Sequence, residues 1–117
     1  MTLTEATTLH DLMRYVDTES VDWKPIDPGS RFRTLHSNKE TGERILMVQW
    51  DAGYTLPFRD EHSYDEFIYI LSGTFVDQHR SSGPGTFIQN EPGSWHQPTT
   101  PDGCTFMVVI SPRHNEA

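Results

Sequence analysis

Four side chains in the middle of the chain form a set that could hold a metal ion. Asp60, His62 and Glu66 precede or begin the apolar segment DEFIYIL, and His96 follows the turn NEPGS. In an extended segment, residues an even number of positions apart point to the same side, so the first three would face inward together. A hairpin register that places His96 opposite them would complete a site of two imidazoles and two carboxylates. Such a mixed N/O set suits Fe(II) as the first choice, and otherwise Zn(II), Mn(II) or Ni(II).

The chain around these residues is predicted to form short β-strands. Short apolar segments recur about every ten residues and are separated by turns rich in Gly, Pro, Asn and Asp. In chain order they are residues 21–24, residues 32–36, ERILMVQW, DEFIYIL, TFVDQHR, TFIQ, WHQP and CTFMVVI. Seven to nine such strands with no helix between them are typical of an all-β sandwich or barrel, which closes most simply as a double-sheet jelly roll.

DEFIYIL is the strongest strand candidate. Ile68 and Ile70 share one face with Glu66, and Tyr69 and Leu71 share the other. Both faces are largely apolar, which predicts a central strand or a strand with one face at an interface.

Residues 8–16 are predicted to form a short N-terminal helix. Four apolar residues follow helical spacing, namely Leu9, Leu12, Met13 and Val16. Thr8 and Asp11 approximate a capping box. This apolar stripe and the two apolar faces of DEFIYIL need surfaces to cover, so we expect a homodimer.

Composition limits the remaining choices. The 117 residues correspond to a single domain, residues 1–117. The net charge of −8 argues against a nucleic-acid partner, and no run of about 18 apolar residues could cross a membrane. The N-terminus has neither the basic nor the apolar region of a signal peptide. The single cysteine, Cys104, excludes an internal disulfide, and we expect a cytoplasmic protein.

The central stretch resembles the two sequence motifs of the cupin superfamily. The first motif has a Gly, His-x-His, a Glu and then, after six intervening residues, a Gly, and this chain has Gly53, Asp60-x-His62, Glu66 and Gly73. Counting from Glu66 places Asp60 at the first histidine of the motif, whereas counting from Gly53 places Arg59 there. One extra residue in this loop explains the disagreement.

The second motif has a Gly and then Pro-x-Gly-x-x-His, and Gly85, Pro92, Gly93 and His96 follow it, with Glu91 at the motif's Pro position. The segments LSGTFVDQH, GPGTFIQNEPGSWHQP and PDGC are similar to the ChrR-type cupin subgroup over about residues 20–111. That subgroup includes the cupin domain of a zinc-dependent anti-sigma factor and dioxygenases that cleave acetylacetone or dihydroxyacetophenone. The resemblance implies a cupin-type barrel with metal ligands at His62, Glu66 and His96, and Asp60 as a substitute ligand.

Two functions follow from this resemblance. The first is an enzyme that acts on a small carbonyl or diketone-like compound, by dioxygenase-type carbon–carbon cleavage or by isomerase or lyase chemistry with Glu66 or Asp60 as the base. The second is a non-catalytic module that binds or senses a small ligand. In the metal-free version of this module, Arg59 would pair with Asp60, Glu61 or Glu66 and no cation would be needed. The chain lacks a Cys/His cluster before the barrel, so a sigma-factor partner is not expected.

Overall fold

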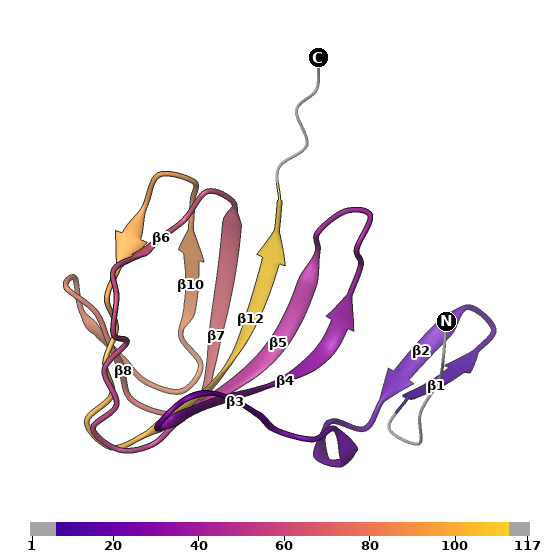
Figure 1. The fold of residues 1–117 in the computed structure, drawn as a ribbon, viewed down its shortest axis with the longest axis horizontal. Coiled ribbons are helices and arrows are strands. Elements are labelled where there is room, and N and C mark those ends of the chain that lie inside the picture. Colours follow the sequence, from indigo (N-terminus) through magenta and orange to yellow (C-terminus); the bar gives the residue numbers. More distant parts are fainter. Residues whose placement is uncertain (1–6, 113–117) are drawn as a thin grey trace.

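The longest strands join into one antiparallel sheet of six strands in the computed structural model, which describes residues 7–112 (Figure 1). The order across the sheet is β10-β7-β12-β5-β4-β3. These strands are β3 (Lys24–Asp27), β4 (Ser30–Ser37), β5 (Arg44–Trp50), β7 (Asp65–Gly73), β10 (Phe87–Asn90) and β12 (Cys104–Ser111). Strand β12 lies between β5 and β7, so the last strand of the described residues occupies a central position in the sheet.

A second layer of short strand pairs faces this sheet and completes a jelly-roll barrel. Strand β6 (Asp60–Glu61) pairs with β11 (Trp95–His96), and β8 (Phe75–Val76) pairs with β9 (Ser81–Ser82). Isolated bridges from Thr99 to Thr55 and to Val76 join these pairs. The all-β architecture expected from the regular strand spacing is therefore confirmed.

Strand β7 has the two-sided pattern that the sequence predicted. It is a central strand between β10 and β12, and the side chains of Ile68 and Ile70 are only 2% and 0% exposed. On the opposite face Tyr69 and Leu71 are 44% and 40% exposed. The inward face packs on a core whose aromatic centre is Trp50, and this packing fixes the register of the strand that carries Glu66.

The predicted helix over residues 8–16 is wrong. This segment is a hairpin of β1 (Thr7–His10) and β2 (Met13–Val16), with positive φ angles of 48° and 65° at Asp11 and Leu12. Two such residues make the type I′ turn that suits the twist of a hairpin. A helix of about nine residues is marginal in water without packing. The hairpin lies beside the sheet (Figure 1), where Arg14 donates to the carbonyl oxygen of Leu35 in β4 at 2.9 Å.

Strand β3 also differs from its predicted position. Residues 21–24 were expected to form the strand, with Pro25 as its end, but β3 spans Lys24–Asp27 and includes Pro25. Because β3 is at the edge of the sheet, the missing N–H of proline costs no ladder hydrogen bond.

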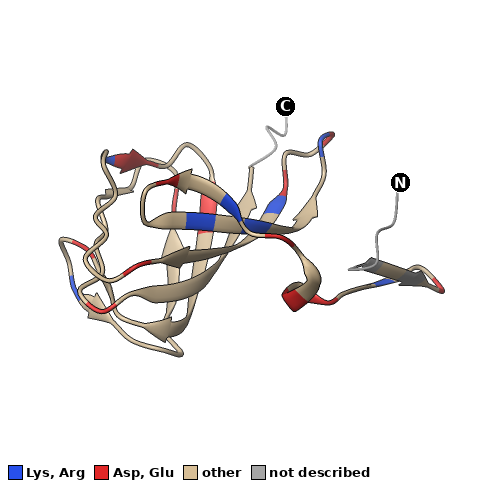
Figure 2. Cartoon of the chain, turned by 60° about the horizontal axis from the view of Figure 1, so that its bottom comes forward, with Lys and Arg blue, Asp and Glu red and all other residues tan. Residues whose placement is uncertain are grey.

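Helical structure is minimal in the described residues. It consists of the turn η1 (Thr18–Ser20), which Asp17 caps by accepting a hydrogen bond from the backbone N–H of Glu19. No helix in residues 7–112 is therefore long enough to cross a membrane. Acidic residues are spread over several loops and strands, as Figure 2 shows.

Candidate metal centre

The pairing of β6 with β11 brings the two halves of the candidate site together. Asp60 and His96 are register partners across these strands, although they are far apart in the sequence. His62 follows β6 directly, and its backbone N–H donates to the carbonyl of Ser94 at 2.9 Å. Glu66 is the second residue of β7, opposite Asn90 of β10. The predicted register that places His96 opposite the first motif is therefore present.

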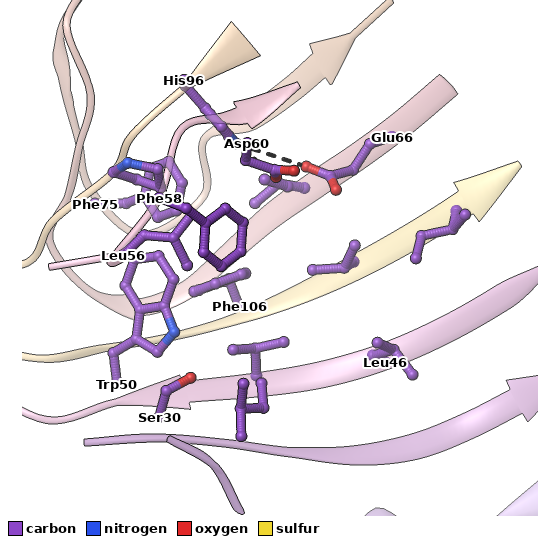
Figure 3. Close-up of a pocket in the computed structure, with 16 residues that line it drawn as sticks. Ser30, Leu46, Trp50, Leu56, Phe58, Asp60, Glu66, Phe75, His96 and Phe106 are labelled. Carbon is purple, nitrogen blue, oxygen red and sulfur yellow. Dashed lines mark ion pairs between the residues drawn. The ribbon is translucent and has the colours of Figure 1, made fainter. Parts of the chain in front are cut away.

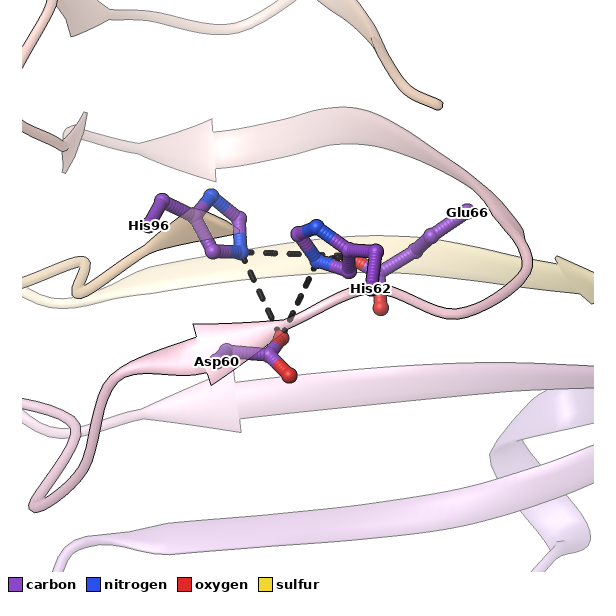
Figure 4. Close-up of side chains that lie close together, drawn as sticks. All are labelled: Asp60, His62, Glu66 and His96. Carbon is purple, nitrogen blue, oxygen red and sulfur yellow. Dashed lines mark ion pairs between the residues drawn. The ribbon is translucent and has the colours of Figure 1, made fainter. Parts of the chain in front are cut away.

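The four side chains converge on one point (Figure 4). Nε2 of His62 lies 3.2 Å from Oδ2 of Asp60 and 3.3 Å from Oε1 of Glu66. Nε2 of His96 lies 3.4 Å and 3.9 Å from the same two oxygens. All four ligand atoms are within 4.8 Å of one another. A metal that takes N and O ligands at about 2.0–2.2 Å leaves neighbouring ligand atoms about 3.0–3.6 Å apart, so this set fits one cation with little movement.

The hydrogen bonds of His62 supply an independent test of that fit. Its Nδ1 lies 3.2 Å from the carbonyl oxygen of Ser94 and 3.0 Å from the hydroxyl of the same residue. The hydroxyl already donates to the carbonyl of Glu91, so both oxygens accept and Nδ1 carries the hydrogen. Nε2 is left buried, with no hydrogen bond of good geometry, between two carboxylates. A neutral imidazole in this position aims a lone pair at negative oxygens, which a proton or a metal cation must separate.

The charges of the cluster shift the pKa values of its members in opposite directions. The carboxylate of Glu66, 3.3 Å from Nε2, raises the pKa of His62 above its usual 6.5 against the effect of burial. The ring of His96, whose Nε2 lies 3.4 Å from Oδ2, lowers the pKa of Asp60 below its usual 3.8. Without a cation, the cluster therefore favours the protonated form of His62 and the ionised form of Asp60.

Arg59 does not neutralise these carboxylates. Its Nε lies 3.4 Å from Oε1 of Glu61, and its guanidinium stacks 3.7 Å above the ring of Trp95. The metal-free hypothesis allowed Glu61 as a partner, but the side chain of Glu61 is 73% exposed and lies outside the cluster. Asp60, not Arg59, occupies the position beside His62.

A cavity of about 200 Å³ opens from the cluster into the barrel (Figure 3). The carboxylates of Asp60 and Glu66 and the ring of His96 form its polar end. The rest of its wall is almost entirely apolar and comes from both layers: Ile26, Ser30, Leu46, Val48, Trp50, Leu56, Phe58, Ile68, Phe75, Pro98, Phe106, Val108 and Ile110. Among the described residues that line it, none is Lys or Arg, so it offers no side-chain cation to an anionic ligand.

Three aromatic residues expected near the site have different positions. Phe58 lines the cavity, and the ring of Tyr64 meets the ring of His62 edge-on at a centroid distance of 6.3 Å. Tyr54 instead belongs to the core, where it packs on Trp50 and donates its hydroxyl to Asp27 at 2.9 Å.

The sequence did not predict two residues that hydrogen-bond to the candidate metal ligands. Nδ2 of Asn90 donates to Oε1 of Glu66 at 3.2 Å, and Ser94 accepts from His62. Ser94 is the last residue of the turn that precedes His96 and so had a positional signal. Asn90 had none, because only the register of β10 on β7 places it beside Glu66.

The ChrR cupin-like domain model matches residues 12–113. The chain belongs to this family. No curated protein has a significant match to the chain. Among solved structures, an RmlC-like cupin from Ralstonia eutropha is 16% identical, has a TM-score of 0.74, and aligns over 82% of this chain and 66% of its own.

Two further structures are similar in fold. The anti-sigma factor ChrR of Rhodobacter sphaeroides, solved with SigE, is 21% identical with a TM-score of 0.70, and aligns over 80% of this chain and 51% of its own. A candidate acetylacetone dioxygenase from Methylibium petroleiphilum is 19% identical with a TM-score of 0.73, and aligns over 83% of this chain and 75% of its own. The chain thus spans half to two thirds of the length of the first and second of these three relatives. These likenesses confirm the cupin fold.

Proposed function

We propose that this cupin is a metal-dependent enzyme whose substrate is a small, uncharged carbonyl compound. Asp60, His62, Glu66 and His96 would hold one divalent cation, with Fe(II) as the first choice and Zn(II), Mn(II) or Ni(II) as alternatives. The observation that carries this proposal is the buried Nε2 of His62, which has two carboxylate oxygens within 3.3 Å and no hydrogen bond. A cation satisfies all three groups together.

The charge of the ligand set favours orientation of a substrate over strong activation of water. Two carboxylates and two neutral imidazoles leave a divalent site with no net charge, which makes the ion a weaker Lewis acid than in an all-histidine site. A bound cation would orient and polarise the carbonyl or enolate oxygen of a substrate. The protein's own part is to fix that oxygen at the polar end of the cavity and to keep the carbon skeleton in the apolar end.

The cavity supports the substrate class. Its volume of about 200 Å³ is somewhat larger than the roughly 150 Å³ cavity that holds benzene, so a compact ligand fits. Asp60 and Glu66 already balance the charge of a divalent cation, and the lining adds no Lys or Arg, so burying a carboxylate or phosphate there would be costly. A diketone or hydroxyketone has the required oxygens and no charge. The fold neighbour described as a candidate acetylacetone dioxygenase supports dioxygenase-type carbon–carbon cleavage as the reaction.

Asp60 and Glu66 are the bases within reach of such a substrate, since both carboxylates line the cavity. The lowered pKa of Asp60 makes it the weaker base of its kind and suits it to holding charge. Glu66 is anchored by Asn90 through the oxygen that faces the histidines. If no oxygen is consumed, proton transfer by Glu66 would support isomerase or lyase chemistry.

A metal-free ligand-binding module is the second candidate. The observation in its favour is that the imidazoles and carboxylates pair with one another at 3.2–3.4 Å, so a proton on His62 can replace the cation. In this case the cavity would bind the same class of small, uncharged carbonyl compound without turnover.

Metal analysis combined with oxygen uptake separates the two candidates. The protein is purified without chelators, loaded with Fe(II), and tested with diketones and hydroxyketones, and with carboxylates of matched size. Stoichiometric metal and oxygen uptake with the uncharged compounds alone would support the dioxygenase. His96→Ala serves as the control, which should lose both metal and uptake. Ligand binding that persists with no metal, even after reconstitution, would favour the binding module.

A further inference from the structure

His96 stands between two cavities of different character. Its ring lines the apolar cavity in the barrel and also a polar cavity of about 390 Å³ on the other side. Nε2 faces Asp60 and Glu66, and in Figure 4 the other ring nitrogen points away from these carboxylates. Asn90 and Ser94 also line the polar cavity. Asn90 hydrogen-bonds to Glu66, and Ser94 hydrogen-bonds to His62.

His96 differs from His62, because the ring nitrogen that points away from the carboxylates has no hydrogen-bond partner. The side chain is 4% exposed, and Nδ1 is buried without a hydrogen-bond partner. The nearest acid is Asp77, whose Oδ2 lies 4.0 Å from Nδ1 and whose side chain is 11% exposed. A buried imidazole N–H facing a carboxylate is the arrangement that fixes the tautomer of metal-binding histidines.

The loop after β8 holds Asp77 in place. Oδ1 accepts the backbone N–H groups of His79 at 2.8 Å and of Arg80 at 3.1 Å. The backbone N–H of Asp77 donates to the carbonyl of Arg80 at 3.1 Å. These three bonds use one carboxylate oxygen and the backbone, so the other oxygen is left to face His96.

We propose that Asp77 is a positioning residue for His96. It keeps the hydrogen of the ring on Nδ1, so that Nε2 presents its lone pair to the cation. The present gap exceeds hydrogen-bond distance by about 1 Å, which a small rotation of the ring toward Asp77 or one water in the polar cavity closes. This inference rests on the proposed metal binding, and Asp77 would act only through His96.

Asp77→Asn is the sharpest test because it changes little else. The Asn oxygen can still accept the N–H groups of His79 and Arg80, while its NH₂ group would face the N–H of His96 and repel that tautomer. Loss of such an outer partner lowers metal affinity by about 10–100-fold. Asp102→Asn is the matched control. It removes the same charge, but Asp102 binds Thr74 and takes no part in the cluster.

Two measurements decide the outcome. Affinity for Zn(II) is measured by competition with a chelator, and the histidine tautomers of the Zn(II)-loaded protein are read from ¹⁵N NMR shifts of the rings. We expect Nδ1 of His96 to be protonated in the wild type. In Asp77→Asn, affinity should fall 10–100-fold and the shifts of His96 should change, while those of His62 stay. The thermal midpoint of the metal-free variant should stay close to that of the wild type.

Three results would overturn the inference. The first is wild-type affinity and unchanged His96 shifts in Asp77→Asn, and the second is an equal loss of affinity in Asp102→Asn, which would indicate a charge effect. The third, protonation of His96 at Nε2 in the loaded wild type, would refute it even if the variant failed to fold. A wild type that binds no Zn(II) would refute the proposed metal binding itself. This result is distinct from the other three, because each of those requires a wild type that binds Zn(II).

Discussion

Asp60 and His96 face each other across the short β6–β11 pair, and their side chains meet at 3.4 Å. This one contact joins the two sequence motifs into a site. It also settles the register of the loop before His62. Glu61, the residue after Asp60, pairs with Trp95 and turns its side chain outward.

We therefore predict opposite effects for neighbouring carboxylates. Asp60→Ala should weaken Zn(II) binding by about 10-fold or more, since it removes a charged ligand. Glu61→Ala should stay within about twofold of the wild type, because its charge is screened at the surface. His96→Ala should abolish binding. Calorimetric titration with Zn(II) checks all three variants. A damaging Glu61→Ala would show that the register is wrong, and full metal content in His96→Ala would refute the site.

The sheet turn at Gly73 offers a stability test with an internal control. A Cβ at Gly73 would collide with the backbone carbonyl of Gly103, and the φ angle of 78° disfavours any other residue. Gly53 has a φ angle of 84° but open space around its Cβ position. Gly53→Ala should cost about 1–2 kcal/mol of unfolding free energy from φ alone. Gly73→Ala should cost ~4 kcal/mol or prevent folding. Equal midpoints in urea would contradict this.

The sequence determined the inner part of the site better than its surroundings. Alternation along β7 was readable because one face is buried, so Ile68 and Ile70 could be assigned inward with Glu66. Asn90 and Asp77 could not be found, since each lies near its ligand only through a strand register or loop geometry that no local pattern encodes. Residues 8–16 failed for another reason: their apolar spacing suits a helix, but Leu12 and Met13 are 96% and 56% exposed, so burial does not select that helix.

Homodimer formation remains a prediction, and the outer face of the sheet gives it a testable form. Tyr69 and Phe87 are register partners and are 44% and 60% exposed, and Met107 lies opposite Tyr69 on the other side. Covering this apolar face with the same face of a second copy would remove it from water. We expect a dimer by light scattering at micromolar concentration, and a monomer for Tyr69→Glu.

Leu12→Glu is the control for this dimer. It adds the same charge at a residue that is 96% exposed in the hairpin turn between β1 and β2. It should remain dimeric if the sheet face is the interface. A monomeric wild type would reject the dimer, and a dimeric Tyr69→Glu with a monomeric Leu12→Glu would move the interface to the hairpin.

The opposed pKa shifts of His62 and Asp60 predict how stability and metal affinity depend on pH. The pKa of His62 is raised in the folded state, mainly by Glu66, so its contribution to the stability of the metal-free protein is complete below about 6.5. This contribution is lost as the pH rises through the higher folded value. The pKa of Asp60 is lowered, so its contribution is present above about 3.8 and lost as the pH falls below it. Metal binding needs the neutral imidazole and therefore strengthens over the range in which the stability of the metal-free protein declines.

The measurement is the thermal midpoint from pH 5.5 to 9, with EDTA and with excess Zn(II). With EDTA the midpoint should fall by a few degrees above pH 6.5, and the difference between the two curves should widen in the same range. His62→Gln is the control, because its amide cannot titrate, and its EDTA curve should lose this slope. An EDTA midpoint that stays level or rises between pH 6.5 and 8.5 in the wild type would show that His62 is neutral in the metal-free cluster. Its lone pair would then face the oxygens of Asp60 and Glu66 with no proton between them, contrary to the geometry at 3.2 and 3.3 Å.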